Sequence, residues 1–94
     1  MAKISIDSIV VVADKVVSCD LDGEVAILNI TDGIYYGLDP IGAKIWNLIQ
    51  KPRELKEIIR IILDEYDVDK ERCKKDIFEL LGELIDNGLV NINE

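Results

Sequence analysis

The sequence contains no histidine and only two cysteines, Cys19 and Cys73, which are far apart in the chain. Histidine is the commonest general base of enzymes, and two thiols alone are too few ligands for a zinc site. A glycine-rich phosphate loop, a GxSxG motif and a GxGxxG motif are also absent. We therefore expect no enzymatic activity, no cofactor and no metal. We interpret both cysteines as small buried residues of a reducing compartment, with a disulfide as the alternative.

Long apolar runs are missing as well. No segment of the sequence approaches the length of a membrane span, and nothing resembles a signal peptide. This predicts a cytoplasmic protein without a membrane partner. The formal net charge of −8 is shared equally by the two halves of the chain, which argues against a nucleic-acid partner. The length of 94 residues predicts a single domain, 1–94.

The N-terminal third consists of short segments rich in β-branched residues. These segments cover residues 8–13, 16–21, 24–30 and 34–38. Two turn signals, LDG ending at Gly23 and TDG ending at Gly33, separate the last three of them. The pattern predicts an antiparallel meander of about three strands.

Three amphipathic helices are predicted to follow, over about residues 40–50, 52–66 and 70–86. Asp39 and Asp69 are good N-caps, and Pro40 is a good first helical residue. Gly88 ends the third helix as a left-handed cap, and a short strand closes the chain. The predicted class is α+β: a winged helix-turn-helix, in which a three-stranded antiparallel sheet is followed by three helices and a short C-terminal strand.

The predicted strand IYYGL carries two adjacent tyrosines, whose side chains must point to opposite faces of the sheet. Because Leu38 leads into the first helix, we expect Ile34, Tyr36 and Leu38 to face the core. Tyr35 and Gly37 then face outward. A bulge near Gly37 is the alternative, and it would exchange the two tyrosines.

This strand is the last of its sheet, so one edge is open unless the C-terminal strand pairs with it. The segment has no proline and no charge, which are the usual protections of an exposed edge. Gly37 either lets another backbone come close or only eases the bend into the helix. An unprotected edge predicts that an extended peptide docks here by adding a strand.

The third predicted helix is expected to lie along one side of such a peptide and to contact its side chains. Phe78 lies about a quarter turn away from the apolar stripe of this helix, so it either completes the core or forms the floor of a groove. Arg72 and Lys75 lie near the helix start, where they are expected to meet acidic groups of a bound peptide.

A DNA-binding regulator is the alternative function for a helix-turn-helix. The cations that such a helix would use on DNA are Lys70, Arg72, Lys74 and Lys75. They alternate with acids, and this interspersed charge is typical of a solvated helix surface with pairs such as Glu71–Lys75. Peptide binding is therefore the favoured interpretation.

The sequence also resembles a known family over about residues 22–90. The landmarks are the YYGLD exit of the strand, the GAKIW helix, DEY before DVD, and the closing LIDNGLV. In this order and spacing they resemble the PqqD-like proteins. The resemblance implies a winged helix-turn-helix that recognises the leader segment of a ribosomally made precursor peptide and presents it to a modifying enzyme.

The YYGLD…IW pattern most resembles the stand-alone members of lasso-peptide pathways, which implies a leader protease as the partner enzyme. A partnership with a radical SAM peptide-modifying enzyme is the alternative. In the family the leader adds a strand beside the last strand of the meander and lies against the third helix. The peptide-binding residues implied are Ile34, Tyr35, Tyr36, Gly37, Leu38, Arg72, Lys75, Asp76, Phe78 and Glu79. An exposed edge strand also pairs with its own copy, so we expect a monomer or a weak homodimer.

Overall fold

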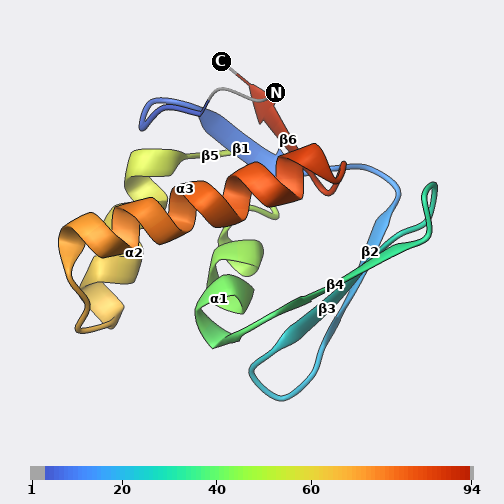
Figure 1. Cartoon of the computed structure of the whole chain (residues 1–94), viewed down its shortest axis with the longest axis horizontal. Coiled ribbons are helices and arrows are strands. Elements are labelled where there is room, and N and C mark those ends of the chain that lie inside the picture. Colours follow the sequence, from blue (N-terminus) through green and yellow to red (C-terminus); the bar gives the residue numbers. More distant parts are fainter. Residues whose placement is uncertain (1–3, 94) are drawn as a thin grey trace.

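Two three-stranded antiparallel sheets and three helices make up the computed structural model, which describes residues 4–93 (Figure 1). The elements in chain order are β1 (Ile9–Val12), β2 (Val16–Asp20), β3 (Val25–Asn29), β4 (Ile34–Leu38), α1 (Pro40–Leu48), β5 (Arg53–Glu54), α2 (Leu55–Glu65), α3 (Lys70–Asp86) and β6 (Val90–Asn93). The predicted α+β class, the three helices and the C-terminal strand are confirmed. The winged helix-turn-helix description stays a prediction. Within residues 4–93, no helix is both long enough and apolar enough to cross a membrane.

The first sheet is the predicted meander, in the order β2–β3–β4. The backbones of Leu21 and Glu24 exchange two hydrogen bonds of 2.7 and 3.3 Å around a two-residue turn. Both turn residues, Asp22 and Gly23, have positive φ, which is the geometry that favours a tight hairpin. The loop from β3 to β4 ends at Gly33, which also has positive φ and donates its N–H to the carbonyl of Asn29 at 2.8 Å.

The second sheet, in the order β5–β1–β6, is not anticipated by the sequence patterns. β1 pairs with β6 from Ile9 opposite Asn93 to Val12 opposite Val90, so the first described strand lies beside the last one. β1 also pairs with β5, and the prediction that the second helix restarts at Pro52 is therefore wrong. Chain ends and a two-residue strand pair here across long sequence separations, and these pairings have no local signature.

The start of α2 illustrates the same effect of tertiary pairing. Its N-cap residue, Glu54, makes no side-chain capping hydrogen bond. Instead, the N–H groups of Leu55 and Lys56 each donate at 2.9 Å to the carbonyls of Ser8 and Ile6. The N-terminal segment thus satisfies the first amides of the helix, which would otherwise lack partners.

The other helix ends follow the predicted chemistry. The carboxylates of Asp39 and Asp69 accept hydrogen bonds from the N–H groups of Gly42 and Arg72, at 2.8 and 3.0 Å. At the end of α3, Gly88 has a φ of 76° and donates to Ile85, and Leu89 donates to the carbonyl of Leu84.

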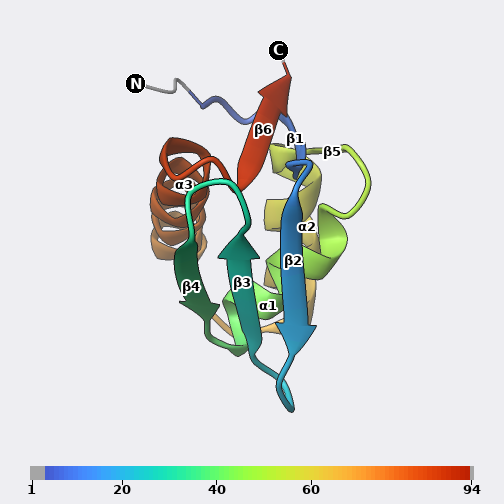
Figure 2. The same cartoon turned by 90° about the vertical axis from the view of Figure 1, so that its right-hand side faces the viewer.

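The core lies between the helices and the inner faces of both sheets (Figure 2). α1 contacts β3 and β4, while α3 contacts α2 and β6. Cys73 is buried in this core, as predicted, but Cys19 is exposed, so that part of the prediction is wrong. Cys19 lies on β2, an edge strand, and its side chain is on the face of the sheet turned away from the helices. Both cysteines are free thiols.

A buried asparagine joins the meander to the end of α3. Asn29, at the end of β3, is 5% exposed. Its Nδ2 donates to the carbonyls of Asn87 and Gly88 at 3.3 and 3.5 Å, and its Oδ1 accepts from the N–H groups of Thr31 and Asp32. One amide side chain therefore connects the β3–β4 loop to the C-terminus of α3.

Replacing Asn29 by Asp tests this connection. The change places a carboxylate against two carbonyl oxygens, and we expect it to lower the free energy of unfolding by roughly 2–4 kcal/mol at neutral pH. Asn29→Ala removes the amide without adding charge and is expected to cost about 1–3 kcal/mol. Urea denaturation at neutral and at acidic pH measures both. Only the Asp variant should regain stability on acidification, and an Asp variant as stable as the wild type would contradict the role of Asn29.

Candidate functional site

The edge of β4 that faces away from β3 has no strand beside it in the described part of the chain (Figure 2). The C-terminal strand, which was the alternative partner of this edge, pairs with β1 instead. The predicted open edge is therefore confirmed. An open edge presents unpaired N–H and C=O groups to any segment that arrives in an extended conformation.

Backbone N–H and C=O groups alternate in direction along each strand of the meander, and this alternation determines which residues of β4 present unpaired groups at the open edge. Leu21 and Glu24 form a hydrogen-bonded pair, and the N–H of Ile30 donates to the carbonyl of Lys15 at 3.2 Å. Backbone groups of successive residues alternate in direction along an antiparallel strand. Even-numbered residues of β3 therefore bond to β2, and odd-numbered residues bond to β4.

The same alternation continues into β4. Val25, Ile27 and Asn29 lie opposite Leu38, Tyr36 and Ile34, so the backbone groups of these three β4 residues point to β3. The backbone N–H and C=O of Tyr35 and Gly37 consequently point outward. These two residues supply the hydrogen-bonding groups of the free edge.

The side chains of β4 lie as the sequence predicts. Tyr36 is half-buried and packs against the core, whereas Tyr35 is 68% exposed. Ile34 is half-buried and Leu38 is buried. Tyr36 and Leu38 thus face the helices, and the alternative with a bulge and exchanged tyrosines is wrong.

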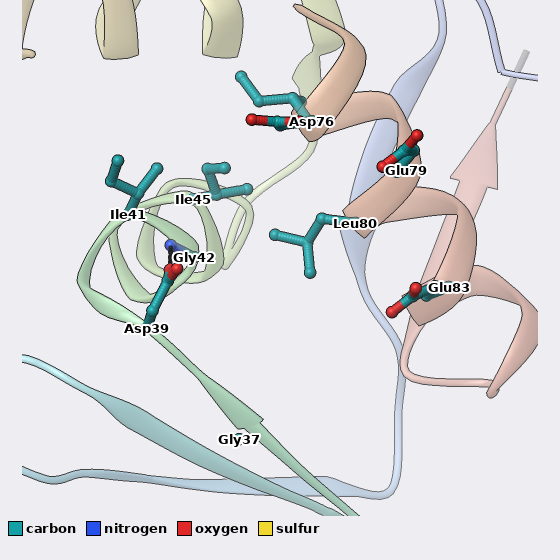
Figure 3. Close-up of a pocket in the computed structure, with 10 residues that line it drawn as sticks. Gly37, Asp39, Ile41, Gly42, Ile45, Asp76, Glu79, Leu80 and Glu83 are labelled. Atoms are coloured by element: carbon teal, nitrogen blue, oxygen red, sulfur yellow. Dashed lines mark hydrogen bonds between the residues drawn. The ribbon is translucent and has the colours of Figure 1, made fainter. Parts of the chain in front are cut away.

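A cleft of about 490 Å³ lies along this edge, between α3 on one side and the end of β4 with α1 on the other (Figure 3). Its lining residues are Gly37, Asp39, Ile41, Gly42, Ile45, Asp76, Ile77, Glu79, Leu80 and Glu83. Leu80 points from α3 into the space in front of α1, where Ile41 and Ile45 lie. The cleft therefore has an apolar centre directly beside the open strand edge.

Four carboxylates surround this apolar centre, and no lysine or arginine of residues 4–93 lines the cleft. They belong to Asp39, Asp76, Glu79 and Glu83. The ion pairs found within residues 4–93 involve other acids, namely Glu65, Glu57, Asp7 and Glu54. No three His, Cys, Asp or Glu side chains of the described segment are placed to hold a metal ion. The cleft therefore presents negative charge that no ion pair of the described chain neutralises.

One hydrogen bond crosses from the sheet to α3 at the end of the cleft. The Tyr36 hydroxyl donates to Oε2 of Glu83. This bond to an ionised carboxylate, together with burial and the nearby negative charge, raises the pKa of Tyr36 to about 12. Tyr36 is thus held as a neutral donor, and β4 and α3 are connected beside the cleft.

A second hollow continues the groove toward the start of α3. It measures about 320 Å³ and shares Ile41, Asp76 and Ile77 with the first cleft. Arg72 and Cys73 also line it. Burial, and secondarily the charge of Asp76, raises the pKa of the Cys73 thiol, which keeps this thiol protonated.

The structure brings together part of the predicted site. Gly37, Asp76 and Glu79 line the cleft, and Arg72 lines the adjoining hollow. Lys75 and Phe78 line neither. At 100° per residue, Phe78 lies on the flank of α3 opposite to Leu80, where it packs half-buried against the core.

Sequence reasoning missed several residues of the cleft. Ile41 and Ile45 appear in the sequence only as the apolar face of a helix, and Leu80 only as part of a core stripe. Glu83 appears as one more exposed acid. The available signal was the spacing of Asp76, Glu79, Leu80 and Glu83, which places them on one face of a helix.

The outer face of the meander is apolar and exposed. Val17, Leu28 and Tyr35 lie opposite one another across the three strands, and each of them is at least 40% exposed. Gly37 belongs to the same face. A segment added beside β4 would extend this face by one strand.

Comparisons with known proteins relate this chain to one family and to solved structures of the same fold. The model of a family described as coenzyme PQQ synthesis protein D (PqqD) matches residues 24–90. A solved structure of TbiB1 in complex with the TbiA(beta) leader peptide is 34% identical, with a TM-score of 0.80, covering 86% of this chain and 94% of the other. A structure of lasso peptide synthetase B1 complexed with the leader peptide shares the fold at 20% identity, with a TM-score of 0.76 over 87% and 96% of the two chains. No curated protein matches the chain.

The bond between Tyr36 and Glu83 is open to a double-mutant test. We expect Tyr36→Phe and Glu83→Gln each to lower the free energy of unfolding, with a coupling energy of about 1 kcal/mol between them. Urea denaturation of the wild type, both single variants and the double variant near neutral pH gives this coupling. Strictly additive effects would show that the bond contributes nothing.

The pH dependence of the same coupling follows from the pKa of Tyr36. The group has a raised pKa in the folded chain, so its contribution is complete below the ordinary value of 10.0. It is lost as the pH rises from 10.0 through about 12, because the unfolded chain ionises first. The stability difference between the wild type and Tyr36→Phe should therefore shrink over that range.

Proposed function

The chain belongs to the PqqD family, and from this premise we propose that it binds the leader segment of a ribosomally synthesised precursor peptide by strand addition at β4. The observation that carries the proposal is the open edge of β4, with the backbone groups of Tyr35 and Gly37 pointing outward beside the cleft. The 34% identity to TbiB1, a protein solved in complex with a leader peptide, supports the same function.

The geometry of the edge suits an extended peptide. An added strand would form main-chain hydrogen bonds with Tyr35 and Gly37, and these bonds would provide affinity for any sequence. Peptide side chains opposite Tyr36 and Leu38 would enter the cleft, because residues directly opposite in a sheet share a face. Those opposite Tyr35 and Gly37 would lie on the outer apolar face. The backbone would thus give affinity and the cleft would give selectivity.

The contact area along one short strand and one helix face is small. We expect an affinity near micromolar, which corresponds to about −8 kcal/mol. Such an affinity suits a carrier that must release the peptide to an enzyme. Of the predicted residues, Ile34, Tyr35, Tyr36, Gly37, Leu38, Asp76 and Glu79 would contact the peptide or support its strand, and Arg72 would contact its extension into the second hollow. Lys75 and Phe78, which line neither hollow, would act only on a peptide that reaches past them.

The bound leader would be presented to a modifying enzyme. On the resemblance of the YYGLD…IW pattern, we propose a leader protease of a lasso-peptide pathway, with a radical SAM enzyme as the alternative. The neighbouring genes distinguish the two. A short precursor, a protease and a cyclase beside this gene would support the first, and a radical SAM enzyme would support the second.

A proline at Tyr35 tests the docking mode. Tyr35→Pro removes one outward N–H without removing a bond to β3, and we expect the affinity for a fluorescently labelled leader to fall about tenfold. Tyr35→Ala, which keeps the backbone donor, is the control and should bind within a factor of about three, because an exposed side chain adds little. Fluorescence anisotropy measures the affinities, and circular dichroism verifies the fold of each variant.

N-methylation of single amides of the leader provides a second readout that leaves the protein unchanged. Methyl groups on every second residue of the docked segment should abolish binding, and those on the intervening residues should not. Sensitivity without this two-residue period would contradict strand addition. A flat titration of unmodified leader, with intact binding to the partner enzyme, would instead indicate a structural subunit without a peptide role.

A further inference from the structure

The chemistry of the cleft restricts which peptides are accepted. We propose that the bound segment carries an apolar side chain flanked, two positions away on each side, by lysine or arginine. This inference rests on the proposed function, because it assumes a strand added at β4. It names the class of substrate that the site prefers, namely a peptide with the alternating pattern cation–x–apolar–x–cation.

The first step is the direction of the peptide side chains. Tyr35 and Gly37 bond the added strand, so every second residue of that strand faces α3 and the cleft. Only these residues meet the lining of the cleft. The pattern must therefore repeat every two residues.

The second step is the arrangement of the lining. Asp76, Glu79 and Glu83 are three and four residues apart on one stripe of α3, and Leu80 lies within this stripe. At 1.5 Å per residue the stripe extends over about 10 Å. Three alternate residues of an extended strand span roughly 13 Å, slightly more than the stripe. The side chains of lysine and arginine are long and flexible enough to compensate for this difference. The middle residue then lies near Leu80, and the outer two reach carboxylates.

The third step is charge. The four carboxylates of the cleft make no ion pair with a described residue, and the whole chain has a formal charge of −8. Within residues 4–93, Arg72 lines the adjoining hollow about one turn before Asp76, and Lys75 lies one turn before Glu79 on α3 but lines neither hollow. The charged residues of 4–93 that line the cleft itself are therefore all acidic. An acidic peptide residue placed there would meet like charge, so the cleft both attracts cations and rejects acids.

The hydrogen bond between Tyr36 and Glu83 limits what can be tested by mutation. Glu83 already accepts the Tyr36 hydroxyl, so changing it would disturb the connection between β4 and α3. The carboxylates of Asp76 and Glu79 accept no hydrogen bond from any side chain or backbone N–H of residues 4–93, and both residues are exposed. The double change Asp76→Asn and Glu79→Gln therefore removes charge with little cost to folding.

Selection from a displayed library of random peptides tests the inference without knowledge of the natural leader. The library is selected on the wild-type chain and depleted on Tyr35→Pro, so that only binders of the open edge remain. We expect the enriched peptides to carry lysine or arginine on both sides of an apolar residue at alternate positions. Selection on Asp76→Asn/Glu79→Gln should yield edge binders without this enrichment of cations.

A matched control separates local charge from net charge. Asp64→Asn/Glu71→Gln removes the same two charges from exposed positions outside the cleft. This control should leave the enrichment unchanged. For one selected peptide, we expect the cleft variant to weaken binding about tenfold and the control by less than about twofold, since each exposed charge pair contributes a factor of about two to five.

The outcomes distinguish the two levels of the proposal. Edge binders without alternate cations, or the same cations enriched on the cleft variant, would overturn the substrate class and leave strand addition intact. If depletion on Tyr35→Pro removes no class of binders, strand addition itself fails, and the substrate class fails with it.

Discussion

The alternation of backbone hydrogen-bond direction along a strand is the constraint on which the site depends. Each residue of the meander directs its N–H and C=O to one neighbour only, and the two-residue turn at Asp22 and Gly23 sets the phase. β3 transmits this phase to β4 without a bulge. The outward direction of the Tyr35 and Gly37 amides is therefore determined by a turn on the far side of the sheet. A slip of one residue would turn Tyr36 outward and would bury Tyr35, so the core and the free edge depend on the same register.

An open strand edge becomes a selective site only if another element lies beside it at a fixed distance and contacts the side chains of the bound peptide. α3 is that element. Within residues 4–93 it is joined to the meander by hydrogen bonds from the Asn29 amide to its C-terminal end and from the Tyr36 hydroxyl to Glu83. Between them and the N-cap of α1 at Asp39, the apolar side chains of Ile41, Ile45 and Leu80 fill the base but leave the edge accessible. Local chemistry thus positions the cleft: a buried amide, a phenol–carboxylate bond and a capping carboxylate.

Local signals in the sequence predicted the elements whose formation depends on local chemistry. Asp39, Pro40, Asp69 and Gly88 determine helix ends through contacts within a few residues, and the two faces of IYYGL follow from the two-residue period of a strand. The sheet of β1, β5 and β6 escaped prediction because it joins the beginning, middle and end of the chain, and no local pattern encodes such pairing. Cys19 was misplaced for a related reason, since a β-branched neighbourhood does not reveal which face of an edge strand is covered. The cleft was predicted only as an edge and a helix, because the angle between α3 and α1 is a property of the packed molecule.

Strand addition and an acidic cleft have different roles in recognition. In the proposed complex, the two outward residues of β4 would provide hydrogen bonds that any peptide backbone satisfies, so they would contribute affinity without discrimination. The carboxylates on α3 would act over longer distances and on side chains, so they would discriminate and also accelerate the encounter with cationic segments. Because exposed charge pairs are weak, this discrimination would be modest for each contact, and the proposed complex would be easily reversible. The proposed transfer of the peptide to an enzyme would need that combination: backbone pairing that accepts the strand in one register, and side-chain contacts that a second protein can displace.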